Sequence, residues 1–265
     1  MGVSLDKVER EAPHMVSLVK QAGVTLEKKG LNPDTYKSAV IATLDHSGSA
    51  AGLYDQGLMQ EAADIAFAAG LLFDDDGAVP LSLFDNGVNP LGDMTLQNCK
   101  NFVAQHQNYR FGGTSYEAAL RWIVDEAGFG NVNLDDGASG GGLFSRSKGS
   151  GGGLSVKAAA AYPTYAIFVT DGEPQDPRQA EVYLRQMSQL PIFVQFIGVG
   201  PHRFDFLRQL DDMDGRFIDN ANFFDAKDAG NDQGKMLELM LSEFPDFYVE
   251  ARRKGLIAQG APVPG

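Results

Sequence analysis

Three oxygen-bearing side chains near the start of the chain have the types and spacing to bind a hard cation together. Asp45, Ser47 and Ser49 directly follow residues 38–44, a mostly apolar segment with several β-branched residues. Their alternate spacing in a tight loop can turn three oxygens toward one point. Carboxylate and hydroxyl oxygens suit Mg²⁺, Mn²⁺ or Ca²⁺. The loop is therefore a candidate metal site.

Two later segments can bring further oxygens to the same place. A second apolar segment, residues 165–170, also ends in an acid, Asp171, and Thr114 lies in a glycine-containing loop between the two segments. If both segments are neighbouring strands, right-handed crossovers place their carboxyl ends side by side. Thr114 and Glu117 also have the spacing of a capping box, in which the hydroxyl serves a backbone amide. The sequence leaves open which role Thr114 has.

The elements that must position these residues follow an alternating pattern. Apolar strand candidates at residues 38–44, 79–84, 165–170 and 192–199 are separated by segments with helical spacing. This alternation predicts a mainly parallel α/β sheet with helices on both faces. Ligands of such sheets bind at the carboxyl ends of the strands. We expect a last edge strand at residues 216–219.

Apolar periodicity and cap residues predict the remaining elements. Asp176 is expected to cap the helix that begins at Pro177. Asp85-Asn86-Gly87 has the composition of a hairpin turn. Helices are expected at residues 13–29, 53–72, 94–106, 118–126, 177–187, 204–210, 236–241 and 247–254.

Composition excludes several classes of partner and site. The net charge of −13 would repel nucleic acids and anionic membranes. Cys99 is the only cysteine, so the chain has no internal disulfide and no cysteine-based zinc site. No apolar stretch is long enough to span a bilayer, and Met1 to Asp6 lack the blocks of a signal peptide. We expect a cytoplasmic protein without membrane insertion.

The five oxygen donors favour binding over catalysis. Two carboxylates only neutralise a divalent cation, so a bound metal keeps its attraction for an external carboxylate. No spare base, nucleophile or oxyanion donor accompanies them, and His46 is given no role. We therefore expect no enzymatic activity.

The motifs resemble those of von Willebrand factor type A domains. Asp45-His46-Ser47-Gly48-Ser49 is similar to the Asp-x-Ser-x-Ser motif of that family, and Gly113-Thr114 and Thr170-Asp171-Gly172 match its second and third metal-site elements in order. The resemblance implies a doubly wound, mostly parallel sheet with one antiparallel edge strand and a metal-ion-dependent adhesion site. It assigns the metal ligands to Asp45, Ser47, Ser49, Thr114 and Asp171.

The flanks narrow the resemblance to the TerF-like group of tellurium-resistance and chemical-stress proteins. Residues 3–7, the helix expected before the first strand, residues 241–247 and the pair Ala251-Arg252 carry this second similarity. It implies a divalent cation, Mg²⁺ first with Mn²⁺ or Ca²⁺ as alternatives, and a protein partner that offers a carboxylate to the metal. Other tellurium-resistance proteins are candidate partners.

The sequence also predicts how the chain is divided. We expect a helical extension at residues 1–35, the von Willebrand factor type A domain at 36–226, closing helices at 227–255 and a frayed tail at 256–265. The glycine-rich segment 137–153 is expected to be a flexible insertion. A linker between domains would have the same composition, but neither half has enough strands to close its own sheet.

Two other functions compete with the binding module. In phosphoryl-transfer enzymes of the haloacid-dehalogenase type, an aspartate after the first strand is the nucleophile, as Asp45 would be here. Those enzymes need a second acid two residues later, where this chain has Ser47. The other alternative is a scaffold without metal, in which the same side chains only cap helices and turns.

Overall fold

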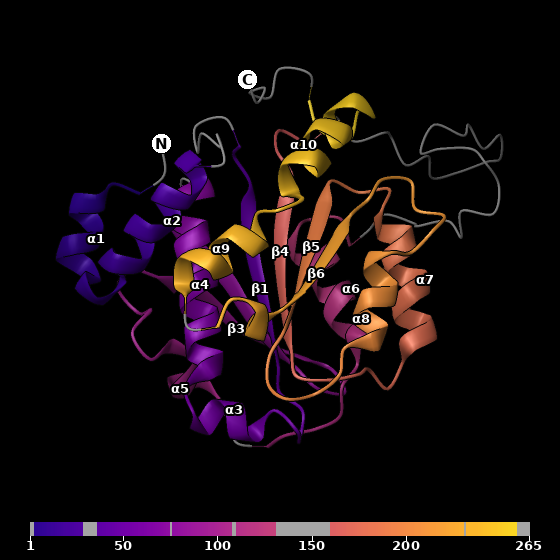
Figure 1. Cartoon of the computed structure of the whole chain (residues 1–265), viewed down its shortest axis with the longest axis horizontal. Coiled ribbons are helices and arrows are strands. Elements are labelled where there is room, and N and C mark those ends of the chain that lie inside the picture. Colours follow the sequence, from indigo (N-terminus) through magenta and orange to yellow (C-terminus); the bar gives the residue numbers. More distant parts are fainter. Residues whose placement is uncertain are drawn as a thin grey trace.

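Six strands form a single sheet in the computed structural model, which describes residues 3–28, 36–74, 76–107, 110–130, 160–230 and 232–258. The strand order is β3-β2-β1-β4-β5-β6 (Figure 1). The bounds are β1 Ala39–Asp45, β2 Ala78–Phe84, β3 Val88–Thr95, β4 Thr164–Thr170, β5 Ile192–Gly198 and β6 Ala221–Asp225.

The sheet is doubly wound, and β3 is its antiparallel edge strand. All other neighbouring strands pair in parallel, while β2 and β3 form a hairpin closed by a hydrogen bond from Asp85 N to Gly87 O, 2.9 Å. β1 and β4 lie side by side in the middle, paired from Ala39↔Thr164 to Leu44↔Val169. The predicted fold class is confirmed, and the carboxyl ends of β1 and β4 are adjacent.

Helices cover both faces of the sheet (Figure 1). The helices α6, α7 and α8 lie on one face, and α2, α4, α9 and α10 pack on the other. The helical elements are α1 Leu5–Glu11, η1 Pro13–Met15, α2 Val16–Lys28, α3 Ala51–Asp55, α4 Leu58–Phe73, α5 Phe102–His106, α6 Tyr116–Glu126, α7 Pro177–Met187, α8 Asp205–Asp211, η2 Ala226–Asp228, α9 Gln233–Met240 and α10 Phe244–Arg253.

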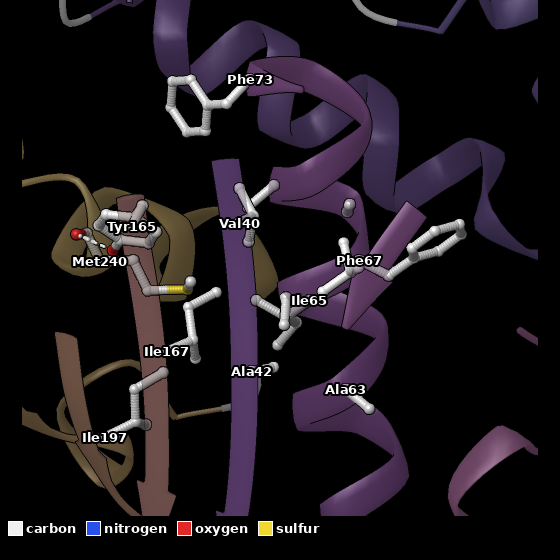
Figure 2. Close-up of a cluster of buried hydrophobic side chains, with 14 of the residues drawn as sticks. Val40, Ala42, Ala63, Ile65, Phe67, Phe73, Tyr165, Ile167, Ile197 and Met240 are labelled. Carbon is white, nitrogen blue, oxygen red and sulfur yellow. Dashed lines mark hydrogen bonds between the residues drawn. The ribbon is translucent and has the colours of Figure 1, made fainter. Parts of the chain in front are cut away.

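Alternate residues of the central strands fill two separate cores. In β1, Val40 and Ala42 face the α4 side with Tyr165 and Ile167 of β4, as Figure 2 shows, whereas Ile41 belongs to the core under α6 and α7. The buried Tyr165 donates its hydroxyl hydrogen to Met240 O at 2.6 Å, so its polar atom is satisfied. Burial on both faces explains why these strands are apolar throughout.

Three predicted elements differ from the observed ones. The helix expected at 53–72 is divided into α3 and α4, because Gly57 between them takes φ +77°. The helix expected at 94–106 was wrong before Phe102: Met94 and Thr95 end β3, where Met94 pairs with Val79, and residues 96–101 form turns that lead into α5. The edge strand expected at 216–219 was also wrong, since β6 begins at Ala221 and pairs in parallel with β5.

The two ends of the described chain are more ordered than expected. The extension contains α1 in addition to the predicted helix. Leu256 and Ile257 are not frayed: Ile257 is fully buried, and Ala258 N donates to Ala160 O at 2.8 Å. The predicted glycine-rich insertion and residues 259–265 lie outside the described residues. In the ranges that are described, every helix is too short or too polar to cross a bilayer.

An acid at the end of α8 should make stability depend on pH. Burial, followed by the charges of Glu243, Asp212 and Asp219, raises the pKa of Asp211 to about 7, although Arg216 opposes the shift. The folded state then holds a proton that the unfolded state releases above about pH 4. The free energy of unfolding therefore falls as pH rises from about 4 to 7.

Asp211→Asn should remove that fall. We expect the variant to gain on the order of 1 kcal/mol over wild type at pH 8, after allowance for solvent screening, and little at pH 4. Urea unfolding at both pH values, in chelator, measures the difference. The exposed Asp214→Asn serves as the control. An equal gain at both pH values would contradict the assignment.

Candidate metal centre

Asp45 ends β1 as a fully buried carboxylate whose two oxygens both have protein donors. Oδ1 accepts the amide hydrogen of Ser47 at 2.8 Å, and Oδ2 accepts the hydroxyl hydrogen of Thr170 at 2.6 Å. Burial raises the pKa of Asp45 to about 6, and the charge of Asp171 adds to the effect, while the hydrogen bonds from Thr170 and Ser47 oppose it. Asp45 is thus placed to act on a metal through water or through its neighbours, since its own oxygens are occupied.

Ser47, Ser49 and Asp171 form a compact triangle of oxygens beside Asp45. The two serine Oγ atoms are 3.0 Å apart, and Asp171 Oδ1 lies 3.3 Å from Ser47 Oγ and 3.0 Å from Ser49 Oγ. Neighbouring ligands of an octahedral Mg²⁺ with bonds of about 2.1 Å are ~3.0 Å apart. The triangle therefore has the size of one face of such an octahedron, and these residues fit a small hard cation.

Asp171 also carries a buried oxygen without a partner. The residue is 1% exposed, and its Oδ2 accepts no hydrogen bond within the described part of the chain. Buried carboxylate oxygens are normally satisfied, because an isolated buried charge is costly. Two acids in contact with the same loop and one orphaned oxygen indicate a place where positive charge stabilises the fold.

The structure brings the Thr114 loop to the same edge but does not join the Thr114 hydroxyl to the triangle. Gly112 pairs with Ser47 as an isolated parallel bridge, and Gly48 N donates to Gly112 O at 3.0 Å. Thr114 itself contacts Gln175, whose amide hydrogen it accepts on its carbonyl at 2.9 Å. Across the described ranges, no hydrogen bond connects its side chain to Asp45, Ser47 or Asp171. Four of the five predicted ligands are thus in mutual contact.

The predicted capping box does not form, so capping does not occupy the Thr114 hydroxyl. The residue that caps α6 is Ser115, which accepts the amide hydrogen of Ala118 at 3.3 Å. Glu117 instead pairs with Arg121, 2.7 Å, one turn along the helix.

Asp176 occupies the predicted N-cap position of α7, but its side chain caps a different helix. Its side chain makes no cap to α7; it accepts hydrogens from Ser115 Oγ at 2.7 Å and from the amides of Tyr116 and Glu117, each at 3.0 Å. A carboxylate at the start of a helix satisfies free amides and complements the helix dipole. Asp176 therefore ties the loop after β4 to the start of α6, next to Thr114.

Sequence reasoning missed the residues that hold the acids in place. The buried Tyr116 donates its hydroxyl hydrogen toward Gly172 O at 2.5 Å, with Thr170 Oγ1 at 3.0 Å, and Thr170 in turn donates to Asp45. Tyr54 donates to Asp45 O at 2.8 Å. A tyrosine on the apolar side of a helix has the same sequence pattern as a core residue, so no signal distinguished these two.

Acids and histidines alone do not make this site. In the part of the chain that the structure describes, no three His, Cys, Asp or Glu side chains gather as a metal group. The candidate centre instead combines two carboxylates with serine hydroxyls. This composition excludes a conventional zinc centre of nitrogen and sulfur ligands and matches an oxygen-rich cation site.

A comparison with known protein families covers the candidate site and the elements around it. The profile described as "vWA-TerF-like: vWA found in TerF C terminus" matches residues 37–134 and 154–257. The chain belongs to the vWA-TerF-like family. The match includes all five predicted ligands and continues through α9 and α10 to Ile257. The predicted membership is confirmed.

Individual relatives and solved structures share less than a quarter of their residues with this chain. "Uncharacterized protein YcbR" of Bacillus subtilis (strain 168) is 24% identical over 249 residues, which cover 92% of this chain and 90% of that protein. Proximal thread matrix protein 1 from the mussel byssus, solved "with zinc occupied MIDAS motif", has a TM-score of 0.50 and 15% identity over 78% of this chain and 47% of its own. The chain thus spans about half the length of the mussel protein, and the similarity supports the fold.

A second solved structure is more distant still. Manganese-loaded Plasmodium vivax TRAP protein has a TM-score of 0.46 and 16% identity, over 78% of this chain and 74% of that protein.

Proposed function

We propose that this vWA-TerF-like chain is a non-catalytic module that binds a protein partner through a divalent cation. Ser47, Ser49 and Asp171 would hold the cation directly, Asp45 would act through water, and Thr114 would complete the set. The bound cation supplies an electrophilic position for a carboxylate of the partner. The triangle of oxygens carries the proposal, because its sides of 3.0, 3.0 and 3.3 Å match the ligand spacing of a small hard cation.

The arrangement of Asp45 disfavours the phosphoryl-transfer alternative. A nucleophilic carboxylate needs a free oxygen facing the substrate. Both oxygens of Asp45 accept hydrogen bonds, and the side chain is fully buried. The second acid required for that chemistry is replaced by Ser47, whose hydroxyl contacts Asp171 instead. Binding therefore accounts for the site better than catalysis.

The family supports a proposal for the cellular role of the module. We propose that the module acts in the cytoplasm in a tellurium-resistance or chemical-stress complex, because the profile it matches is the domain of TerF. An acidic segment of another protein in such a complex is the expected partner, since a carboxylate can complete the cation's coordination. This cellular role is a separate question from metal binding. It is tested by isolating the protein partner bound to this chain in the presence and in the absence of a chelator.

Calorimetry tests the metal site directly. We expect wild type to bind one Mg²⁺ or Mn²⁺ per chain, and Asp45→Ala to bind at least ten-fold more weakly, because the loop loses the carboxylate that fixes Ser47. Asp93→Ala, an exposed acid on the edge strand β3, is the matched control and should bind as wild type does. Equal binding by wild type and Asp45→Ala would contradict the proposal and favour the alternative of a scaffold without metal.

A further inference from the structure

His202 lies beside the orphaned oxygen of Asp171. The loop after β5 runs next to the loop after β4, because Thr170 pairs with Gly198 and Val199 N donates to Thr170 O at 2.8 Å. This places His202 Nε2 3.8 Å from Asp171 Oδ2. The imidazole is 49% exposed, whereas the Asp171 side chain is 2% exposed. A half-exposed nitrogen thus faces a buried oxygen that has no hydrogen-bond partner.

The distance excludes a direct hydrogen bond but allows one ion to touch both atoms. Hydrogen bonds between nitrogen and oxygen extend to about 3.2 Å. Two ligands that each lie about 2.1 Å from one metal are at most ~4.2 Å apart. A separation of 3.8 Å falls inside this second range and outside the first. One metal ion can therefore contact both atoms.

The two oxygens of Asp171 face different partners. Oδ1 receives the hydroxyls of Ser47 and Ser49, and Oδ2 faces His202. A cation held by both oxygens of Asp171 would have serine oxygens on one side and an imidazole nitrogen on the other. Nitrogen ligands favour transition metals such as Zn²⁺, whereas Mg²⁺ strongly prefers oxygen.

We propose that His202 is a metal ligand that determines which cation this site selects, giving Zn²⁺ an advantage over Mg²⁺. The inference deepens the proposed function and rests on it, because it concerns the same cation. The oxygen triangle alone suits Mg²⁺, and the imidazole adds the one interaction that Mg²⁺ does not use well.

The test compares Zn²⁺ and Mg²⁺ affinities at pH 7.5 in three variants. For His202→Ala we expect Zn²⁺ binding to weaken at least ten-fold and Mg²⁺ binding to change less than two-fold. His202→Gln, whose amide can hydrogen-bond but is a poor metal ligand, should behave as His202→Ala does. The control is His14→Ala, because His14 Nε2 lies 3.7 Å from Cys99 Sγ, which makes this pair an alternative zinc-binding place among the described residues.

Each outcome separates the ligand role from its alternatives. A zinc-dependent shift of the His202 imidazole signals in NMR, together with the selective loss in His202→Ala, supports the proposal. Rescue of zinc binding by His202→Gln, equal losses for both metals, or no loss would overturn it and leave the module itself intact. A loss of zinc affinity that appears only in His14→Ala would also overturn the proposal, because it would assign zinc binding to the pair His14 and Cys99. If wild type binds neither cation, the proposed function fails as well.

Discussion

Replacing Asp171 by asparagine is expected to abolish divalent-cation binding while leaving the metal-free protein as stable as wild type or more stable. The variant keeps an oxygen for the hydroxyls of Ser47 and Ser49 but loses the charge that the cation needs. We expect affinity for Mg²⁺ or Mn²⁺ to fall at least 100-fold. In metal-free protein, the same change removes a buried charge whose Oδ2 has no partner and which repels Asp45.

Thermal unfolding with metal and with chelator measures both effects in one experiment. A ligand at 100 times its Kd stabilises the folded state by about 2.7 kcal/mol, so wild type should gain stability on metal addition and Asp171→Asn should gain none. The exposed Asp93→Asn should respond as wild type does. A variant that lost stability in chelator and kept its response to metal would show that Asp171 is only structural.

Gly70→Ala should be the most damaging small substitution in the α4 helix. A Cβ at Gly70 would overlap Val79 Cγ2 of β2 and come within 3.7 Å of Val40 Cβ in β1, so the helix would have to move off the sheet. Overpacking of this kind costs about 1–3 kcal/mol. The helix-propensity gain of alanine over glycine, about 1 kcal/mol, acts in the opposite direction and is smaller.

Gly23→Ala in α2 is the matched control. It is also a glycine inside a helix, but a Cβ there has no atom within 4 Å. Only the propensity term remains, so we expect a stabilisation of about 0.5–1 kcal/mol. Urea unfolding in chelator gives both values. If the two variants shifted the free energy of unfolding in the same direction, the close approach of α4 to the sheet would not be the reason that residue 70 is a glycine.

The candidate metal-site residues that contact one another could be named from the sequence because most of their pattern is local. Asp45, Ser47 and Ser49 lie within five positions, directly after an apolar strand, and Asp171 follows another such strand. Ends of buried strands can be located from apolar runs, since a parallel sheet is buried on both faces. The four residues that contact one another in the structure were all named from that pattern, although their roles as metal ligands remain predictions.

Elements decided by pairing were predicted less well. Residues 94–106 have an apolar spacing compatible with a helix, but the Asp85–Gly87 turn folds residues 88–95 back onto β2. Whether a short segment becomes a strand depends on whether a neighbouring strand offers hydrogen bonds, which the apolar spacing of the segment itself does not show. For the same reason, the last strand is β6 and not the predicted segment 216–219, because β5 provides hydrogen-bond partners from Ala221 onward.

The sequence by itself determined the chemistry of the site: two acids and several hydroxyls at strand ends, a net charge of −13 and a single cysteine. Tertiary structure alone decided which of these atoms meet. The adjacency of β1 and β4 brings Asp45 and Asp171 together, and the loop after β5 brings His202 to 3.8 Å from an oxygen of Asp171. Side-chain types are given by the sequence, but distances between residues far apart in the sequence arise only when the strands take their order in the sheet.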